Sequence, residues 1–381
     1  SAFVAGDWVT IDDTGSNAAT ITSAAPVTPA QLTFNNSAKD FVVTATIGGT
    51  GTPLVKMGTR TATLGSSTVF PANSYTGGTV VLGGILNLTG ASNTNVNYLL
   101  GDAAGGITLN GGQLRASSTN VSGARSVAVL GGGGTLYVNK NNNFTTSGIL
   151  TGSGTLNLLD PGGNGTLATY SFNSTANDFT GGLVLNNAIM NIGRLADSAN
   201  NIVINSNTSS ATGNVNSTPG LKYNSGATSP LTLSGRAIEF SSTVTSAILI
   251  QNNNTTHAIT ISSDLVASGA GTKTLMLDAA GGAGSPTNVF SGDITDGTGG
   301  GTVGVVKPSS TGAASNASTS TWVLSGNNSY TGPTAINTGT LAGIGANAFG
   351  NTSGISIAAA GILSLRGDSS INGGAHIGEV G

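Results

Sequence analysis

A short phrase returns four times along this chain and leads each time into a strand-like run. Each copy has an Asn two places before an aromatic residue, then Ser or Thr directly after the aromatic, and then Gly. The Asn, aromatic and Gly positions of the four copies are Asn73, Tyr75 and Gly77; Asn177, Phe179 and Gly181; Asn288, Phe290 and Gly292; and Asn328, Tyr330 and Gly332. Internal repetition of this kind predicts a repeat architecture in which neighbouring units supply each other's core.

Composition limits the partners that such a repeat protein can have. Charged residues make up only 7% of the chain, against about 25% in an average soluble protein. The 12 Lys and Arg residues are scattered and form no basic stripe, which argues against nucleic-acid binding. No apolar run approaches the roughly 20 residues that cross a bilayer as a helix, so we expect no transmembrane segment. With no Cys, there is neither a disulfide framework nor a thiolate metal site.

Short runs of alternating apolar and polar residues predict many short β-strands. The clearest runs are residues 107–109, 156–158, 231–233, 259–261, 355–357 and 363–365. Gly-Gly and Asn-Asn pairs separate such runs as turn signals, and the helix-favouring residues Lys, Glu, Gln and Arg are scarce. The sequence therefore predicts an all-β protein, either a solenoid or, in part, β-sandwich modules.

Residues 321–341 read Thr-Trp-Val-Leu-Ser-Gly-Asn-Asn-Ser-Tyr-Thr-Gly-Pro-Thr-Ala-Ile-Asn-Thr-Gly-Thr-Leu. This stretch resembles the autotransporter-associated β-strand repeat, or passenger-associated transport repeat, of bacterial type V secretion. That family shows a Leu-x-Leu-Ser-Gly strand, then Asn-x-Tyr-Thr-Gly-Gly-Thr, and then Ile-x-x-Gly-Thr-Leu. The copies at 73–88 and 177–192 also match, and the copy at 288–293 matches in part. Asp293 and Pro333 replace the usual second Gly.

The resemblance implies a right-handed parallel β-helix that is secreted or displayed on a bacterial cell surface. It implies no catalytic residue and no cofactor. In such a solenoid each coil pairs with coils about 4.8 Å above and below, and Gly serves corners where φ is positive. Coils of about 20–25 residues predict about fifteen or more coils. We expect residues 49–381 to form the solenoid, and residues 1–48, which lack the phrase, to form an N-terminal capping or assembly segment.

Two pairs of carboxylates are the candidates for acid–base chemistry or metal binding. They are Asp12 with Asp13 and Asp293 with Asp296. Both pairs stand among turn residues, so we interpret them as turn-forming Asp. The phrase Asp-Ala-Ala-Gly-Gly at 102–106 and 278–282 suggests a calcium turn, yet it lacks the residue order of the calcium-binding nonapeptide coil.

The remaining motifs favour structural interpretations. His257 and His376 are far apart in sequence and make no metal or triad set without further ligands. The cell-attachment tripeptide at 366–368 is a three-residue match that a turn explains. The aromatic residues of the four phrases could stack on a sugar, but we expect them to brace a corner of each module. No metal or cofactor site is predicted.

These observations lead to a first hypothesis and two alternatives. The first is an extracellular structural β-solenoid subunit of a bacterial surface fibre, layer or adhesin that self-assembles, with other copies or other cell-surface components as partners. The second is a monomeric autotransporter-like passenger that displays a carbohydrate- or cell-binding surface. The third is a polysaccharide-active enzyme, for which the sequence offers no convergent cluster of acids. We therefore expect no enzymatic activity.

Overall fold

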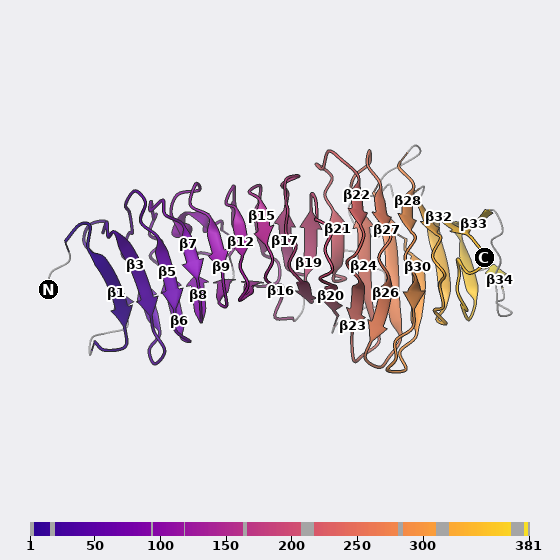
Figure 1. Cartoon of the computed structure of the whole chain (residues 1–381), viewed down its shortest axis with the longest axis horizontal. Helices are drawn as coiled ribbons and strands as arrows, with labels where there is room; N and C mark the ends of the chain where they lie inside the picture. The colour runs from indigo at the N-terminus through magenta and orange to yellow at the C-terminus, as the bar shows by residue number, and fades with distance from the viewer. Residues whose placement is uncertain are drawn as a thin grey trace. The chain divides into compact units, whose positions relative to one another are not determined.

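The chain forms stacked β-strands in two units (Figure 1). The computed structural model describes residues 4–15, 20–92, 94–117, 119–162, 166–206, 217–280, 285–309 and 320–366, and the backbone of 377–379. It divides into an N-terminal unit, Ser1–Gly181, and a C-terminal unit, Gly182–Gly381. The described residues contain no α-helix, only the 3-10 turn η1 (Asn97–Leu100).

Three rows of parallel strands make up the N-terminal unit. From residue 107 onward each coil contributes a strand to every row, whereas the described strands of the earlier coils belong to the first two rows only. The first row is β1 (Trp8–Asp12), β3 (Gln31–Asn35), β5 (Leu54–Met57), β7 (Thr79–Val81), β9 (Ile107–Leu109), β12 (Val127–Val129) and β15 (Leu150–Gly152). The second is β2 (Thr20–Ile21), β4 (Phe41–Val43), β6 (Thr61–Leu64), β8 (Ile85–Leu88), β10 (Gln113–Ala116), β13 (Gly134–Val138) and β16 (Leu156–Leu159). The third is β11 (Val121–Gly123), β14 (Asn143–Thr146) and β17 (Thr169–Phe172).

The C-terminal unit repeats this plan. One row is β18 (Leu183–Asn186), β20 (Ile202–Asn205), β23 (Ile238–Ser241), β26 (Leu265–Ser268) and β29 (Ile294–Thr295). A second is β19 (Ile189–Ile192), β21 (Gly220–Tyr223), β24 (Ser246–Asn252), β27 (Lys273–Ala279), β30 (Val303–Lys307) and β32 (Thr334–Ile344). The third is β22 (Leu231–Leu233), β25 (Ile259–Ile261), β28 (Asn288–Phe290) and β31 (Thr321–Leu324), which also joins β32, followed by β33 (Ile355–Arg366) and β34 (Ile377–Glu379).

A ladder of identical side chains shows how the alternating sequence builds the core. Leu86, Leu114, Leu136 and Leu158 are register partners on successive strands of the second row and are at most 2% exposed. Alternate positions point outward, as the period of two predicts. Burying each Leu contributes about 1.5–3 kcal/mol before the entropy of ordering the chain is subtracted.

The predicted all-β parallel β-helix is confirmed, since every pairing between described strands is parallel. Its right-handed sense stays a prediction. The expected number of coils was too high, because the solenoid has about 13 turns. Loops between strands lengthen several coils: Thr79 pairs with Ile107, and Ile202 pairs with Ile238.

The boundary predicted at residue 48 does not interrupt the sheets. β3 and β5 lie on either side of it and pair in parallel, with Leu32 opposite Leu54. The described residues before position 48 therefore form coils of the same kind as those that follow. The capping or assembly role of residues 1–48 stays a prediction.

Candidate functional site

The Asn of the repeated phrase connects one coil to the coil before it. In each copy the side-chain Oδ1 accepts a hydrogen bond from a backbone N–H of the preceding coil. The Asn–N–H pairs and their distances are Asn73 with Ile47 (2.8 Å), Asn177 with Leu150 (2.8 Å), Asn288 with Ile259 (3.0 Å) and Asn328 with Ile294 (2.8 Å). The four Asn side chains are at most 6% exposed. Each amide thus occupies a place in the hydrogen-bond ladder that a backbone carbonyl would otherwise fill.

Two of these side chains also reach forward to the next coil. Asn73 Nδ2 donates to the carbonyl oxygen of Leu99 at 2.7 Å, and Asn328 Nδ2 donates to that of Ala348 at 2.6 Å. One Asn therefore connects three successive coils at a point where the chain leaves the sheet. We call this arrangement, made by the Asn, aromatic and Gly of each phrase, the repeat junction.

The aromatic residue of every phrase is completely buried. Tyr75, Phe179, Phe290 and Tyr330 are all 0% exposed. The Tyr75 hydroxyl lies 2.7 Å from Thr79 Oγ1, and the Tyr330 hydroxyl lies 2.9 Å from Thr334 Oγ1. Burial raises the pKa of both phenols. Because none of the four rings reaches the surface, they do not offer a stacking platform for a sugar.

The Gly of each phrase stands where another backbone comes too close for a side chain. A Cβ would lie 2.4 Å from the Gly51 oxygen at Gly77, 1.9 Å from the Gly154 oxygen at Gly181, 2.0 Å from the Ser263 oxygen at Gly292 and 2.4 Å from the Val303 oxygen at Gly332. Each contacted oxygen belongs to the preceding coil. We expected Gly at corners because φ is positive there. At these four positions the contacts show a different constraint, which is the lack of space for a Cβ.

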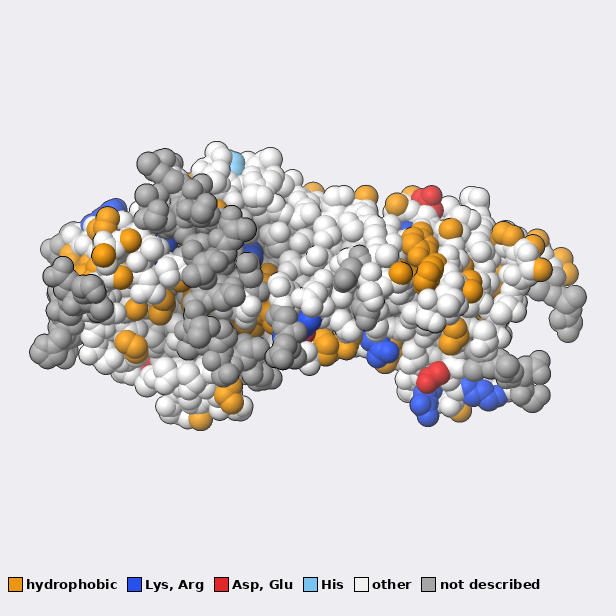
Figure 2. Space-filling model, turned by 180° about the vertical axis from the view of Figure 1, so that it is seen from behind, with side chains coloured by type: hydrophobic (Ala, Val, Ile, Leu, Met, Phe, Trp, Pro, Cys, Tyr) orange, Lys and Arg blue, Asp and Glu red, His pale blue; other side chains and the backbone are white. Residues whose placement is uncertain are grey.

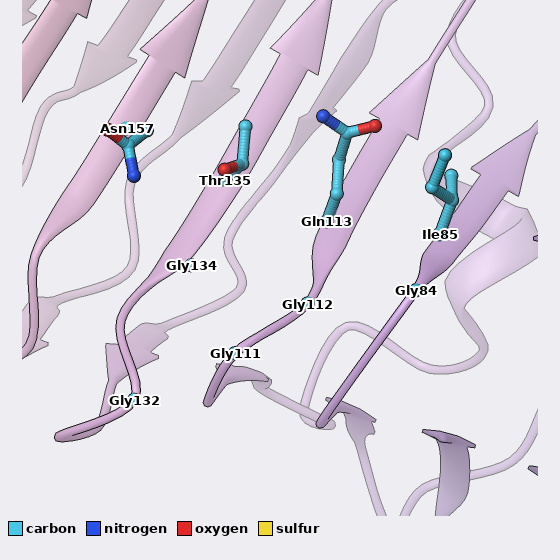
Figure 3. Close-up of a pocket in the computed structure, with 9 residues that line it drawn as sticks. All are labelled: Gly84, Ile85, Gly111, Gly112, Gln113, Gly132, Gly134, Thr135 and Asn157. Carbon is cyan, nitrogen blue, oxygen red and sulfur yellow. The ribbon is translucent and has the colours of Figure 1, made fainter. Parts of the chain in front are cut away.

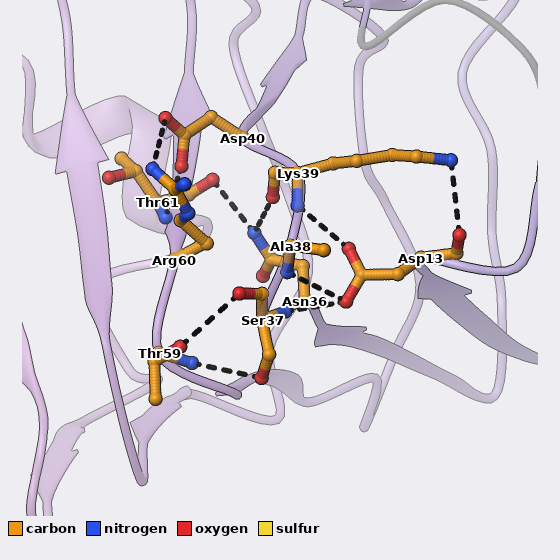
Figure 4. A network of polar contacts seen from close by, with 9 residues as sticks. All are labelled: Asp13, Asn36, Ser37, Ala38, Lys39, Asp40, Thr59, Arg60 and Thr61. Atoms are coloured by element: carbon orange, nitrogen blue, oxygen red, sulfur yellow. Dashed lines mark hydrogen bonds and ion pairs between the residues drawn. The ribbon is translucent and has the colours of Figure 1, made fainter.

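The carboxylate pair Asp12 and Asp13 lies at a corner of the first coils. Asp13 accepts hydrogen bonds from the backbone N–H groups of Ser37 (2.6 Å), Ala38 (3.0 Å) and Lys39 (2.9 Å) in the next coil (Figure 4). The bond from Ser37 is the main reason why the pKa of Asp13 is lowered. Asp12 is occupied with Thr14, whose hydroxyl donates to it at 2.5 Å. These carboxylates hold turns together.

The second pair joins coils in the same way. Asp293 Oδ1 accepts the N–H of Asn327 at 2.7 Å, while the Asp293 N–H donates to Asp264 at 2.9 Å. Asp296 accepts the N–H of Val303 at 2.7 Å and the hydroxyl of Thr331 at 2.6 Å. Acidic side chains at these corners therefore receive N–H and O–H groups, which leaves them little freedom for acid–base chemistry.

The two Asp-Ala-Ala-Gly-Gly phrases differ in their surroundings. Asp102 forms a local turn, in which its Oδ1 accepts the N–H of Ala104 at 2.8 Å. Asp278 instead lies inside β27 and is 1% exposed. Among the described residues no group of three His, Cys, Asp or Glu could hold a metal ion. His376 and positions 367–368 of the attachment tripeptide lie outside the described residues.

A shallow polar groove crosses the second row of the N-terminal unit (Figure 3). Its volume is about 430 Å³, and Gln113, Thr135 and Asn157 line it from successive strands. Gly-rich turns before these strands leave the backbone accessible. Sequence reasoning missed this groove. The Gly residues that precede each of these strands could have indicated the groove, but from the sequence alone we interpret them only as turns.

The first described coil exposes apolar residues at its end. Trp8 is 77% exposed, and Val9 and Ile11 are only half-buried although they point toward the core. A hollow of about 280 Å³ opens there between β1 and deeper residues such as Leu32 and Val43. Among the described strands β1 pairs only with β3.

The surface is nearly neutral. On the face in Figure 2, charged side chains are few, and uncharged polar atoms and backbone prevail. In the part of the chain that the structure describes, no helix is long and apolar enough to cross a bilayer.

Stacked parallel coils with buried repeat junctions define a repeat-built β-helix. A sequence model of the passenger-associated-transport-repeat matches residues 54–88 and 317–342. The chain carries this repeat, and the predicted resemblance is confirmed at both places. The copies at 177–192 and 288–293 lie outside the matched segments. No curated protein and no solved structure matches the chain. Fold and repeat together are those of an extracellular passenger-like β-helix protein, secreted or exposed at a surface.

Proposed function

We propose that this chain is a structural subunit of a bacterial surface fibre, layer or adhesin that self-assembles through the end of its solenoid. The observation that carries the proposal is the first described coil, where Val9 and Ile11 line an apolar hollow and Trp8 on the other face of β1 is exposed. The low charge of the chain offers little repulsion against a second copy.

A substitution at this end tests the proposal. Trp8→Glu places a charge on β1, whereas Leu130→Glu places the same charge at another exposed apolar position, 44% exposed, of the same unit. Electron microscopy and light scattering over a dilution series would follow the assemblies. We expect the wild type and Leu130→Glu to assemble and Trp8→Glu to stay single. Single particles of wild type at every concentration would refute self-assembly.

A second candidate function is a monomeric passenger that binds a neutral glycan, and the polar groove favours it. Gln113, Thr135 and Asn157 repeat at the spacing of the coils and carry no charge, which suits the hydroxyls of an uncharged sugar chain. A glycan screen with the whole chain would test it. Gln113→Ala should weaken any binding, while Gln31→Ala, an amide on another row, should not. Equal loss in both variants would exclude the groove.

We also propose that the chain has no catalytic activity. This proposal is supported by the hydrogen bonds that occupy both candidate carboxylate pairs. Incubation with plant and bacterial polysaccharides, followed by a reducing-end assay, would test it. Hydrolysis that disappears in Asp293→Asn would contradict it.

A further inference from the structure

Two oppositely charged side chains meet inside the C-terminal unit without a hydrogen bond. Lys307 on β30 and Asp278 on the neighbouring strand β27 are 0% and 1% exposed, and Lys307 Nζ lies 3.8 Å from Asp278 Oδ1. Neither atom has a hydrogen-bond partner among the described residues. A buried ion pair without additional hydrogen bonds compensates poorly for the loss of hydration of both charges.

Other buried lysines of this chain are held differently. The ammonium groups of Lys56 and Lys273, both in side chains that are 0% exposed, each donate to three backbone carbonyl oxygens. Lys307 has no such carbonyl partner among the described residues. It is therefore a buried amine whose near polar neighbour is a carboxyl group.

The second oxygen of that carboxyl group is fixed. Gln251, the register partner of Asp278 on β24, donates from Nε2 to Asp278 Oδ2 at 2.7 Å and is 4% exposed. Trp322 Nε1 donates to the backbone oxygen of Asp278 at 3.1 Å. Two residues earlier on the same strands, Leu249 and Met276 belong to a buried apolar cluster. The carboxyl group is thus held in position and shielded from water.

We propose that Lys307 and Asp278 condense into an intramolecular isopeptide bond. The neutral amine attacks Cγ of the protonated carboxyl group; the Cγ–Nζ bond forms and the Cγ–Oδ1 bond breaks. Oδ1 leaves as water with the carboxyl proton and one amine proton. Oδ2 becomes the amide oxygen and keeps its hydrogen bond from Gln251, which stabilises the charge that this oxygen carries during the reaction. The balance needs no oxidant and no co-reactant.

The buried environment favours the reacting forms of both groups. Burial raises the pKa of Asp278, against the opposing effect of Lys307, and burial lowers the pKa of Lys307, against the opposing effect of Asp278. A protonated carboxyl and a neutral amine are the forms that condense, and fixed proximity replaces the encounter of two separate molecules. The product replaces two buried ionisable groups with a neutral amide.

The bond would join two successive coils covalently. This chain has no Cys and cannot use a disulfide for that purpose. A cross-link between β27 and β30 closes the loop of one coil and restricts the unfolded chain, as a disulfide does. The inference does not depend on self-assembly or on glycan binding.

Intact-mass spectrometry of the purified whole chain tests the proposal. We expect a mass lower than that of the sequence by one water, and a protease digest should contain a branched peptide that links Lys307 to Asp278. A wild-type chain that shows neither after long incubation overturns the proposal.

Two variants exclude other sources of the lost water. Lys307→Arg cannot condense and should have the full mass, whereas Lys273→Arg, at another buried lysine, should still lose one water. Asp296 precedes a Gly and could form a succinimide, which also loses water. Loss of water that persists in Lys307→Arg would therefore overturn the proposal. If this variant fails to fold, presence or absence of the branched peptide in the wild-type digest decides.

Discussion

The repeat junction predicts a large local effect of removing one amide. Asn328 is 4% exposed and makes two hydrogen bonds, one from the N–H of Ile294 in the preceding coil and one to the oxygen of Ala348 in the next coil. Asn328→Ala removes both and leaves a buried donor and a buried acceptor without partners. Each unsatisfied buried group costs about 1–3 kcal/mol, so we expect a loss of about 2–6 kcal/mol.

Hydrogen exchange measured by mass spectrometry is the suitable assay, because coils of a solenoid open locally and a single unfolding free energy is poorly defined. A loss of 2 kcal/mol corresponds to amide exchange about 30-fold faster in peptides around Ile294 and Ala348. The control is Asn327→Ala, which removes an exposed Asn one position earlier. If both variants exchange at the same rate, the bridging amide does not hold the coils together and the reasoning is wrong.

Three further predictions concern stability. Gly332→Ala should accelerate hydrogen exchange in the same coils, because the clash of its Cβ with the backbone costs about 3 kcal/mol or more. The control Gly131→Ala has open space around its Cβ and should change stability by less than about 1 kcal/mol. Tyr330→Phe should lower the free energy of unfolding in urea by only about 0.5–1.5 kcal/mol, because it loses only the hydroxyl contact to Thr334. The ring remains, as it does in the two copies that have Phe at this position. Burial lowers the pKa of Lys222 to about 8, so between about pH 8 and 10.5 the unfolded state binds more protons and stability should rise with pH. Lys222→Met should reduce that rise in urea titrations at pH 8 and pH 10, while Lys56, whose pKa burial also lowers to about 8, should maintain part of it.

Local pattern was sufficient to predict the strands and the all-β class, whereas the parallel β-helix was implied by the resemblance to the repeat family. All six alternating runs are strands, and the period of two determines which side chains meet, as in the Leu86 to Leu158 ladder. The phrase was recognised as a marker of modules, but its Asn was not recognised as a bridge between coils. That role depends on which backbone N–H of the preceding coil faces the Asn side chain. Because the loops vary in length, the sequence separation between the Asn and that N–H differs from copy to copy and cannot be read from the sequence.

The buried pair of Lys307 and Asp278 was invisible for the same reason. Nothing in the sequence near either residue indicates the other, since their proximity follows from the register of β27 and β30. Asp278 stood in a phrase that suggested a turn, as Asp102 does form one, but the structure continues the strand through it. Identical local phrases thus acquired different structures because the neighbouring coils differ.

The substitutions within the phrase show which of its positions is constrained. The second Gly is Gly78 in the first copy, where φ is +85°, but Pro333 stands at this position in the fourth copy, and the repeat model matches both copies. Proline fixes φ near −65°, so a positive φ is not a general requirement there. The first Gly stays Gly in all four copies because the preceding coil's backbone fills the space of a Cβ.

Buried Asn residues also solve a problem that repetitive cores create. A row of similar Leu side chains would accept a neighbouring coil in more than one register, since a shift by two residues keeps the apolar face inward. A buried Asn does not tolerate such a shift, because its amide would lose its N–H partner and remain unsatisfied. Each repeat junction therefore fixes the register of its coils, and the apolar ladders between junctions supply the burial. Replacing Asn73 by Leu retains the volume of the side chain but removes its hydrogen bonds. This variant should therefore weaken the pairing of its coils although apolar burial is maintained.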